Sequence, residues 1–207
     1  MKQPAGRLII NIEGADKSYF LWNGTELYYK KLRGAYNDIK LNKESDYLYF
    51  SFFTLCAATL EYSLNYLLTD YCLNHFGHER YKKYAEGYIK LPFPEKLHMC
   101  PSIISNGKFR FNDDNKHYIK LKEFITLRNK ILHNKEFLKE FEFSLNSDFT
   151  SKEIVEFEFQ IENNHIETLT KDTCLKFGNA LGEFKSNFMT PALNYHFEPN
   201  ELLTPIT

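Results

Sequence analysis

One short stretch of the chain combines residue types that suit chemistry on phosphate esters. Arg128 is followed directly by Asn129 and, after four intervening residues, by His133. A histidine titrates near neutral pH, so it can act as a general base or acid. An arginine stays charged and presents a planar fork to phosphate oxygens. Asn129 can position a substrate or the imidazole, so Arg128, Asn129 and His133 are the candidate catalytic residues.

The spacing alone is weak evidence, because a second pair in the same chain also fits it. Arg110 and His117 are separated by six residues. Phe111, however, follows this arginine in place of a polar residue, and the pair straddles a predicted loop at 112–115. We therefore favour the pair that begins at Arg128.

The pattern around Arg128 predicts a helix that positions the motif. Over 116–133 the apolar residues recur at helical spacing, with lysines between them. A second, more apolar helix is predicted over 45–75, with Ser45 as its N-cap and Glu61 as a central acid. The motif thus lies at the end of an amphipathic helix that follows an apolar one.

Helical geometry limits what one copy of the motif can do. Asn129 and His133 are four residues apart and share a face of the helix. Arg128 lies five residues from His133, which is about 140° around an ideal helix. One helix cannot easily aim Arg128 and His133 at the same phosphate.

The motif and its setting resemble the HEPN superfamily of helical-bundle proteins, whose signature is Arg, four to six residues, then His, often with a polar residue after the Arg. Here Arg128, Asn129 and His133 occupy those positions, and the resemblance covers about 45–138. It implies a metal-independent endoribonuclease without a cofactor, in which His133 activates the 2′-OH and Arg128 stabilises the pentavalent phosphate. It also implies a homodimer, since family members commonly bring two motifs together across a cleft.

Other residues take supporting roles under this resemblance. Glu61 matches the acid that some family members carry on an earlier helix, and it can orient Arg128 or complete a buried pair. Five lysines can line the cleft and attract RNA without regard to sequence: Lys116, Lys120, Lys122, Lys130 and Lys135. The resemblance also implies a role in a toxin-antitoxin or antiviral system, with an antitoxin or another partner protein.

Each of these residues also has a purely structural interpretation. Arg128 can simply pair with Glu61 or Glu123, and His133 can lie near a helix C-terminus, where the dipole favours a cation. The lysines can be the solvated side of a helix. An alternative function follows, a HEPN-like module that no longer cleaves and serves as an RNA-binding or protein-interaction dimer. A small-molecule-binding helical protein is a third interpretation and would need a closed apolar pocket.

The remaining segments complete a mainly α fold. We predict a single domain over 1–207, an antiparallel bundle of about four helices with small accessory β-hairpins. Its parts are an N-terminal hairpin segment at 1–44, the motif-bearing helices at 45–138, and a hairpin plus the last helix at 139–190. The first hairpin turns at Asn23-Gly24. A short helix is predicted at 79–89. After it, three prolines predict an irregular crossing: Pro92, Pro94 and Pro101.

The second hairpin is expected at 141–161, and the last helix is expected to run from Thr168 or Thr170 to Pro191. We expect the residues after Pro191 to be irregular.

Composition excludes several classes of protein. The 207 residues carry 26 basic and 27 acidic side chains, for a net charge of −1, and 43% are hydrophobic. Such a chain can bury a core and is neither disordered nor coated with basic charge. We find no signal-peptide pattern and no apolar run long enough to span a membrane, so we expect a cytoplasmic protein. The four cysteines are expected to be reduced and buried.

A zinc site is the weaker interpretation of one cluster of potential ligands. Cys72, His75 and His78 are spaced in threes, and His98 and Cys100 follow. Gly77 interrupts the predicted helix, and the spacing matches no recognised pair of zinc ligands. We therefore expect no metal site.

Overall fold

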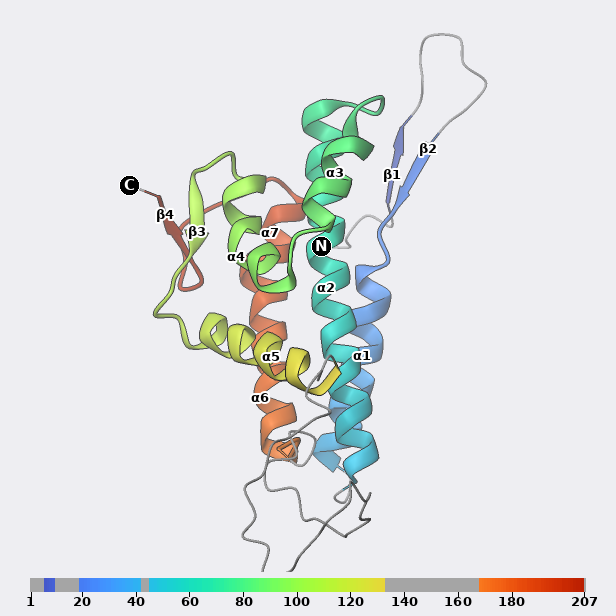
Figure 1. The fold of residues 1–207 in the computed structure, drawn as a ribbon, viewed down its shortest axis with the longest axis vertical. Coiled ribbons are helices and arrows are strands. Elements are labelled where there is room, and N and C mark those ends of the chain that lie inside the picture. Colours follow the sequence, from blue (N-terminus) through green and yellow to red (C-terminus); the bar gives the residue numbers. More distant parts are fainter. Residues whose placement is uncertain (1–5, 10–18, 42–44, 133–167, 207) are drawn as a thin grey trace, which may run out of the picture.

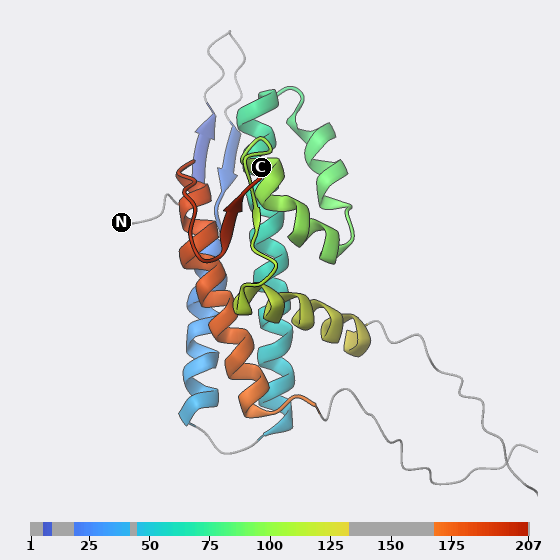
Figure 2. The same ribbon diagram turned by 90° about the vertical axis from the view of Figure 1, so that its left-hand side faces the viewer.

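The computed structural model describes residues 6–9, 19–41, 45–132 and 168–206. Three long elements run side by side along the molecule: α1 (Thr25–Leu41), α2 (Asp46–Phe76) and α6 (Lys171–Phe184) (Figure 1). The helix that carries the motif, α5 (Lys116–Leu132), lies across them (Figure 2). The mainly α prediction is confirmed, whereas α5 crosses the other helices instead of running antiparallel to them.

The apolar helix α2 is the centre of the fold, because apolar residues occupy all of its sides. It begins after Ser45, whose Oγ accepts a hydrogen bond from the Leu48 backbone N–H at 3.4 Å, as the sequence predicts. It ends at Gly77, which takes a positive φ of 71°. The short helix α3 (Tyr81–Ile89) then packs back against α2, close to the range expected from the sequence.

The predicted Asn-Gly hairpin is wrong. Tyr19–Trp22 forms β2, but it pairs antiparallel with β1 (Gly6–Ile9), and the residues after Gly24 form α1. Neither Asn23 nor Gly24 is among the described residues with positive φ, which a type I′ turn requires. Asn23 instead caps the helix, its Oδ1 accepting the Thr25 N–H at 3.0 Å.

The predicted irregular crossing at the three prolines is also wrong, because they belong to α4 (Phe93–Ile104). Pro92 caps this helix and Pro94 lies in its first turn, where the missing proline N–H would have no partner in the helix anyway. Pro101 lies inside the helix and is buried. Two of these prolines therefore begin a helix and do not exclude one.

The last helix begins where the sequence predicts but continues beyond Pro191. Thr170 caps α6 by accepting the Thr173 N–H at 3.2 Å. A π-helical turn (Lys185–Met189) and α7 (Thr190–Leu193) then continue the helix. Pro191 has no N–H to donate to the carbonyl of Asn187, and this carbonyl accepts a hydrogen bond from the Asn200 side chain at 3.0 Å.

The segment after α7 is more ordered than expected. Leu203–Pro205 forms β4, which pairs antiparallel with β3 (Phe109–Phe111) in a second two-stranded sheet. The predicted turn at 112–115 is confirmed, and Asn115 at its end caps α5 by accepting the N–H groups of His117 and Tyr118. The predicted hairpin at 141–161 lies outside the described residues.

Three aromatic rings fix α5 to the long helices. Phe124 of α5 meets Phe53 of α2 and Phe177 of α6, each at 4.9 Å between ring centroids and in edge-on geometry. All three side chains are buried. Aromatic pairs in this geometry stabilise the fold beyond the contribution of the buried area alone. Among the described helices, none is both long and apolar enough to cross a membrane.

Candidate functional site

Arg128 lies on the face of α5 that packs inward, and its side chain is 18% exposed. Its guanidinium lies 5.6 Å from the centroid of the Phe93 ring of α4. One terminal nitrogen donates to the Asn129 Oδ1 at 3.0 Å, and the other lies 3.7 Å from the Glu61 carboxylate. The fold thus holds Arg128 at the junction of α2, α4 and α5.

Glu61 supplies the acid at this junction. Its Oε2 faces Arg128, and its Oε1 lies 3.9 Å from the Nζ of Lys96 on α4. The carboxylate therefore bridges two cations that come from two other helices. The predicted pairing of Arg128 with Glu61 is confirmed, whereas the other acid considered, Glu123, pairs with Lys120.

Lys96 is the member of this cluster that the sequence interpretation missed. Its side chain is only 2% exposed, and its Nζ donates to the Asn65 Oδ1 of α2 at 2.7 Å. Burial lowers the pKa of Lys96, and the nearby Glu61 carboxylate partly offsets this effect. Lys96 is next to Leu97 and lies three residues after Phe93, on the inner side of α4. This spacing indicates a buried lysine only if 93–104 is a helix, which the sequence did not predict.

Of the other two predicted catalytic residues, the structure describes Asn129 but not His133. Asn129 contacts Arg128 directly and is partly exposed. His133 lies outside the described residues, directly after the last described turn of α5. The cluster of Glu61, Lys96, Arg128 and Asn129 has a formal charge of +1 with both lysine and arginine protonated. Such a cluster can hold an arginine fixed and still favour a phosphate nearby.

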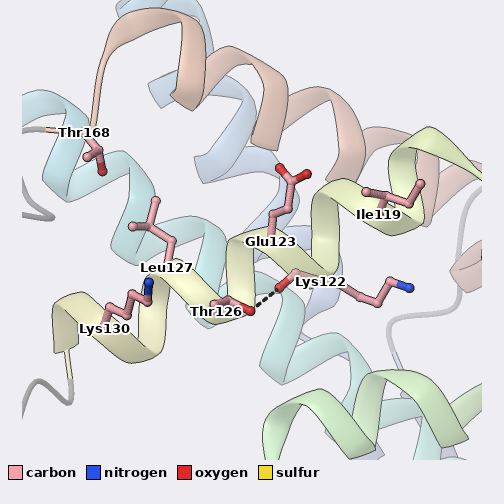
Figure 3. Close-up of a pocket in the computed structure, with 7 residues that line it drawn as sticks. All are labelled: Ile119, Lys122, Glu123, Thr126, Leu127, Lys130 and Thr168. Atoms are coloured by element: carbon pink, nitrogen blue, oxygen red, sulfur yellow. Dashed lines mark hydrogen bonds between the residues drawn. The ribbon is translucent and has the colours of Figure 1, made fainter.

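The predicted RNA-binding lysines lie elsewhere on α5. Lys120 pairs with Glu123, and the Nζ of Lys122 lies 3.2 Å from Asp113 and 4.6 Å from the centroid of the Tyr118 ring. Lys130 is exposed on a shallow groove of about 500 Å³, which also includes Lys122 and Thr168 (Figure 3). Lys116 is exposed at the other end of α5, and Lys135 lies outside the described residues.

The lysine positions on the helix do not converge on Arg128. On an ideal helix Lys116 and Lys122 lie about 120° around the axis from Arg128, and Lys130 lies about 160° from it. Lys120 lies about 80° from Arg128 and two turns before it. Lys120 and Lys122 are also already paired with acids. The structure therefore brings Glu61, Arg128 and Asn129 together with Lys96, and it leaves the four described RNA-binding candidates on α5 outside that cluster.

The candidate zinc ligands are used in packing. All four cysteines are reduced and buried, as expected, and burial raises the pKa of the Cys72 thiol to about 11. His75 stacks on Tyr71 at 5.3 Å between ring centroids. In the part of the chain that the structure describes, no three His, Cys, Asp or Glu side chains are grouped so that they could hold a metal ion.

The chain matches no protein-family model, and neither curated proteins nor solved structures include a significant match to it.

Proposed function

We propose that this chain is a metal-independent endoribonuclease of the HEPN type that acts as a homodimer in the cytoplasm. In this proposal α1, α2, α5 and α6 form the HEPN-like core, and α5 carries the motif. The observation that supports it best is the Glu61 carboxylate, which lies 3.7 Å from the Arg128 guanidinium and fixes the cation of the motif from an earlier helix. The biological setting that we propose is a toxin-antitoxin or antiviral system, with an antitoxin or partner protein to restrain the enzyme.

The reaction requires a base, a cation and a leaving group. His133 takes the proton of a ribose 2′-OH, and the 2′-oxygen attacks the adjacent phosphorus. Arg128 stabilises the charge that builds up on the pentavalent phosphate. The bond from phosphorus to the 5′-oxygen then breaks, that oxygen takes up a proton, and the products end in a 2′,3′-cyclic phosphate and a 5′-OH. Glu61 and Asn129 act as positioning residues for Arg128.

The first test is cleavage of total RNA and transfer RNA by the purified protein in EDTA. Arg128→Ala and His133→Ala should each lower the rate by at least 100-fold while the protein stays folded. Arg110→Ala and His196→Ala are matched controls, because both residues are exposed, and they should cleave like wild type. Fragment ends should carry 2′,3′-cyclic phosphate. Cleavage that persists in the His133→Ala protein would exclude the proposed mechanism.

A second candidate function is favoured by the burial of Arg128. A side chain that is 18% exposed and already paired with Glu61 also suits a structural role in a non-catalytic RNA-binding or protein-interaction dimer. This candidate predicts that wild type leaves all RNA intact but sediments as a dimer. Binding of labelled RNA without cleavage, unchanged by His133→Ala, would establish it over the nuclease.

A further inference from the structure

A second groove, separate from the Arg128 cluster, lies where α1, α6 and the start of α5 meet. Its volume is about 620 Å³, within the range of small-molecule sites. One face of α6 and the following π-helical turn contribute Gly178, Gly182 and Ser186 to its lining, at four-residue spacing. Leu32 and Tyr36 of α1 line it as well, as does Lys116 of α5.

The two glycines of α6 shape this groove in different ways. A Cβ at Gly178 would lie 2.6 Å from the Tyr36 ring, so only glycine lets that ring lie so close to α6. The Tyr36 hydroxyl donates to the Asn179 Oδ1 at 2.9 Å and holds the ring in place. A Cβ at Gly182, in contrast, would meet nothing within 4 Å. The space above Gly182 is therefore open to a ligand.

The rim of the groove carries an excess of positive charge. Arg33 and Lys116 are exposed at its edge, and Lys185 lies within it, paired with Glu26 at 2.8 Å. The acid in the lining is Glu183, which accepts a hydrogen bond from the Asn187 side chain. The first turn of α5 contains no acid, so the positive end of its dipole adds to these cations. The electrostatics therefore favour an anion.

We propose that this groove binds a nucleoside phosphate, either a free nucleotide or one unit of a single-stranded RNA. Arg33 and Lys116 bind the phosphate, and the apolar wall that includes Leu32 and Tyr36 contacts the nucleoside. The size of the groove, its apolar wall and its cationic rim fit both parts of such a ligand. This site does not depend on the Arg128 motif and holds whether or not the protein cleaves RNA.

The experiment measures binding of two probes to the full chain by fluorescence anisotropy: a fluorescent ATP analogue and a labelled oligouridine of eight nucleotides, whose 2′-O-methyl groups prevent the proposed cleavage. Gly182→Leu places a side chain in the open space of the groove and should weaken binding at least tenfold. Gly87→Leu is the matched control, because Gly87 is also an exposed helical glycine with open space around it, and it should bind like wild type. Lys116→Glu provides a second variant that leaves the packed helix face intact.

The outcomes separate the sources of the ligand. Binding of both probes, lost in Gly182→Leu and Lys116→Glu, supports a nucleotide site. Binding of the oligonucleotide alone, lost in the same variants, supports a unit of an RNA strand. If neither probe binds wild type, or if Gly182→Leu and Lys116→Glu both bind as wild type does while circular dichroism shows them folded, the proposal is wrong. Neither result depends on cleavage, so failure here leaves the proposed nuclease untouched.

Discussion

The two ends of α5 treat positive charge in opposite ways. Near its C-terminal end Arg128 is directed inward, paired with Glu61 and close to the Phe93 ring. At its N-terminal end Lys116 is exposed beside an open groove. One cation is held in a fixed position by protein groups, whereas the other can meet a ligand from solvent. A single amphipathic helix therefore carries one charge that the core fixes in place and another that solvent can reach.

Releasing α5 from the core should disturb both of its ends. Phe124→Ala removes the ring that contacts both Phe53 and Phe177 and should lower the free energy of unfolding by about 3–5 kcal/mol. Urea unfolding followed by circular dichroism measures this effect. Both ends of the helix depend on this contact, so RNA cleavage and nucleotide binding should fall together. A loss below about 1 kcal/mol would mean that α5 is held elsewhere.

The next test compares the two cations directly. Arg128→Ala leaves Glu61 with a more distant partner and removes the contact with Phe93, so we expect a loss of about 1–3 kcal/mol. Lys116→Ala removes an exposed charge and should change stability by less than about 0.5 kcal/mol. Thermal unfolding of the two variants beside wild type checks the difference. Equal effects would contradict the contrast between the ends.

A third test uses the buried Lys96. Its pKa is lowered in the folded state, so the folded protein binds fewer protons than the unfolded chain between the folded pKa and the ordinary value of 10.5. Lys96 therefore costs stability below its folded pKa, and the free energy of unfolding gains a contribution as pH rises toward 10.5. Lys96→Met should remove this contribution. At pH 7 its free energy of unfolding should be no more than about 1 kcal/mol below that of wild type, and it can exceed it.

Denaturant unfolding of both proteins at several pH values from 7 to 10 measures this difference. Identical pH dependence in wild type and Lys96→Met would show that the lysine is no less protonated in the folded protein than in the unfolded chain.

The two glycines of α6 that line the groove differ in what an added methyl group would meet. Gly182→Ala adds a methyl group that meets no neighbouring atom and raises helix propensity, so it should stabilise the protein by about 0.5 kcal/mol. Gly178→Ala should destabilise it, because its Cβ would press on the Tyr36 ring. The sign of the two changes in melting temperature is the measurement. Stabilisation of both variants would mean that the Tyr36 ring can move away from α6 and make room for the methyl group.

Helical spacing predicted the elements that position Arg128, since α2, α5 and the start of α6 follow directly from their apolar patterns and caps. The pairing with Glu61 was also predictable, because both residues lie on helices that the pattern identifies. The sequence misled where one residue type serves two purposes. Asn23 is as good a helix cap as a turn residue, and Pro92 and Pro94 can begin a helix as well as exclude one.

Lys96 and the groove were beyond prediction for a different reason. A lysine is ordinarily exposed, and only the packing of α4 on α2 shows that this one is buried. The groove joins residues of three helices that are far apart in the sequence. Its shape depends on Gly178 and Gly182, and their four-residue spacing indicates no groove until the position of Tyr36 is known.

The pairing of β3 with β4 sets a limit on when this fold can be completed during synthesis. The two strands are roughly 90 residues apart along the chain. At the usual rate of translation of about 5–20 residues per second, β3 leaves the ribosome roughly 5–18 s before its partner. Throughout that interval the backbone of β3 has no strand partner from β4, and Phe111 lacks Leu203, the residue that pairs with it. A nascent chain of this protein therefore passes through a period in which that edge is open to a chaperone.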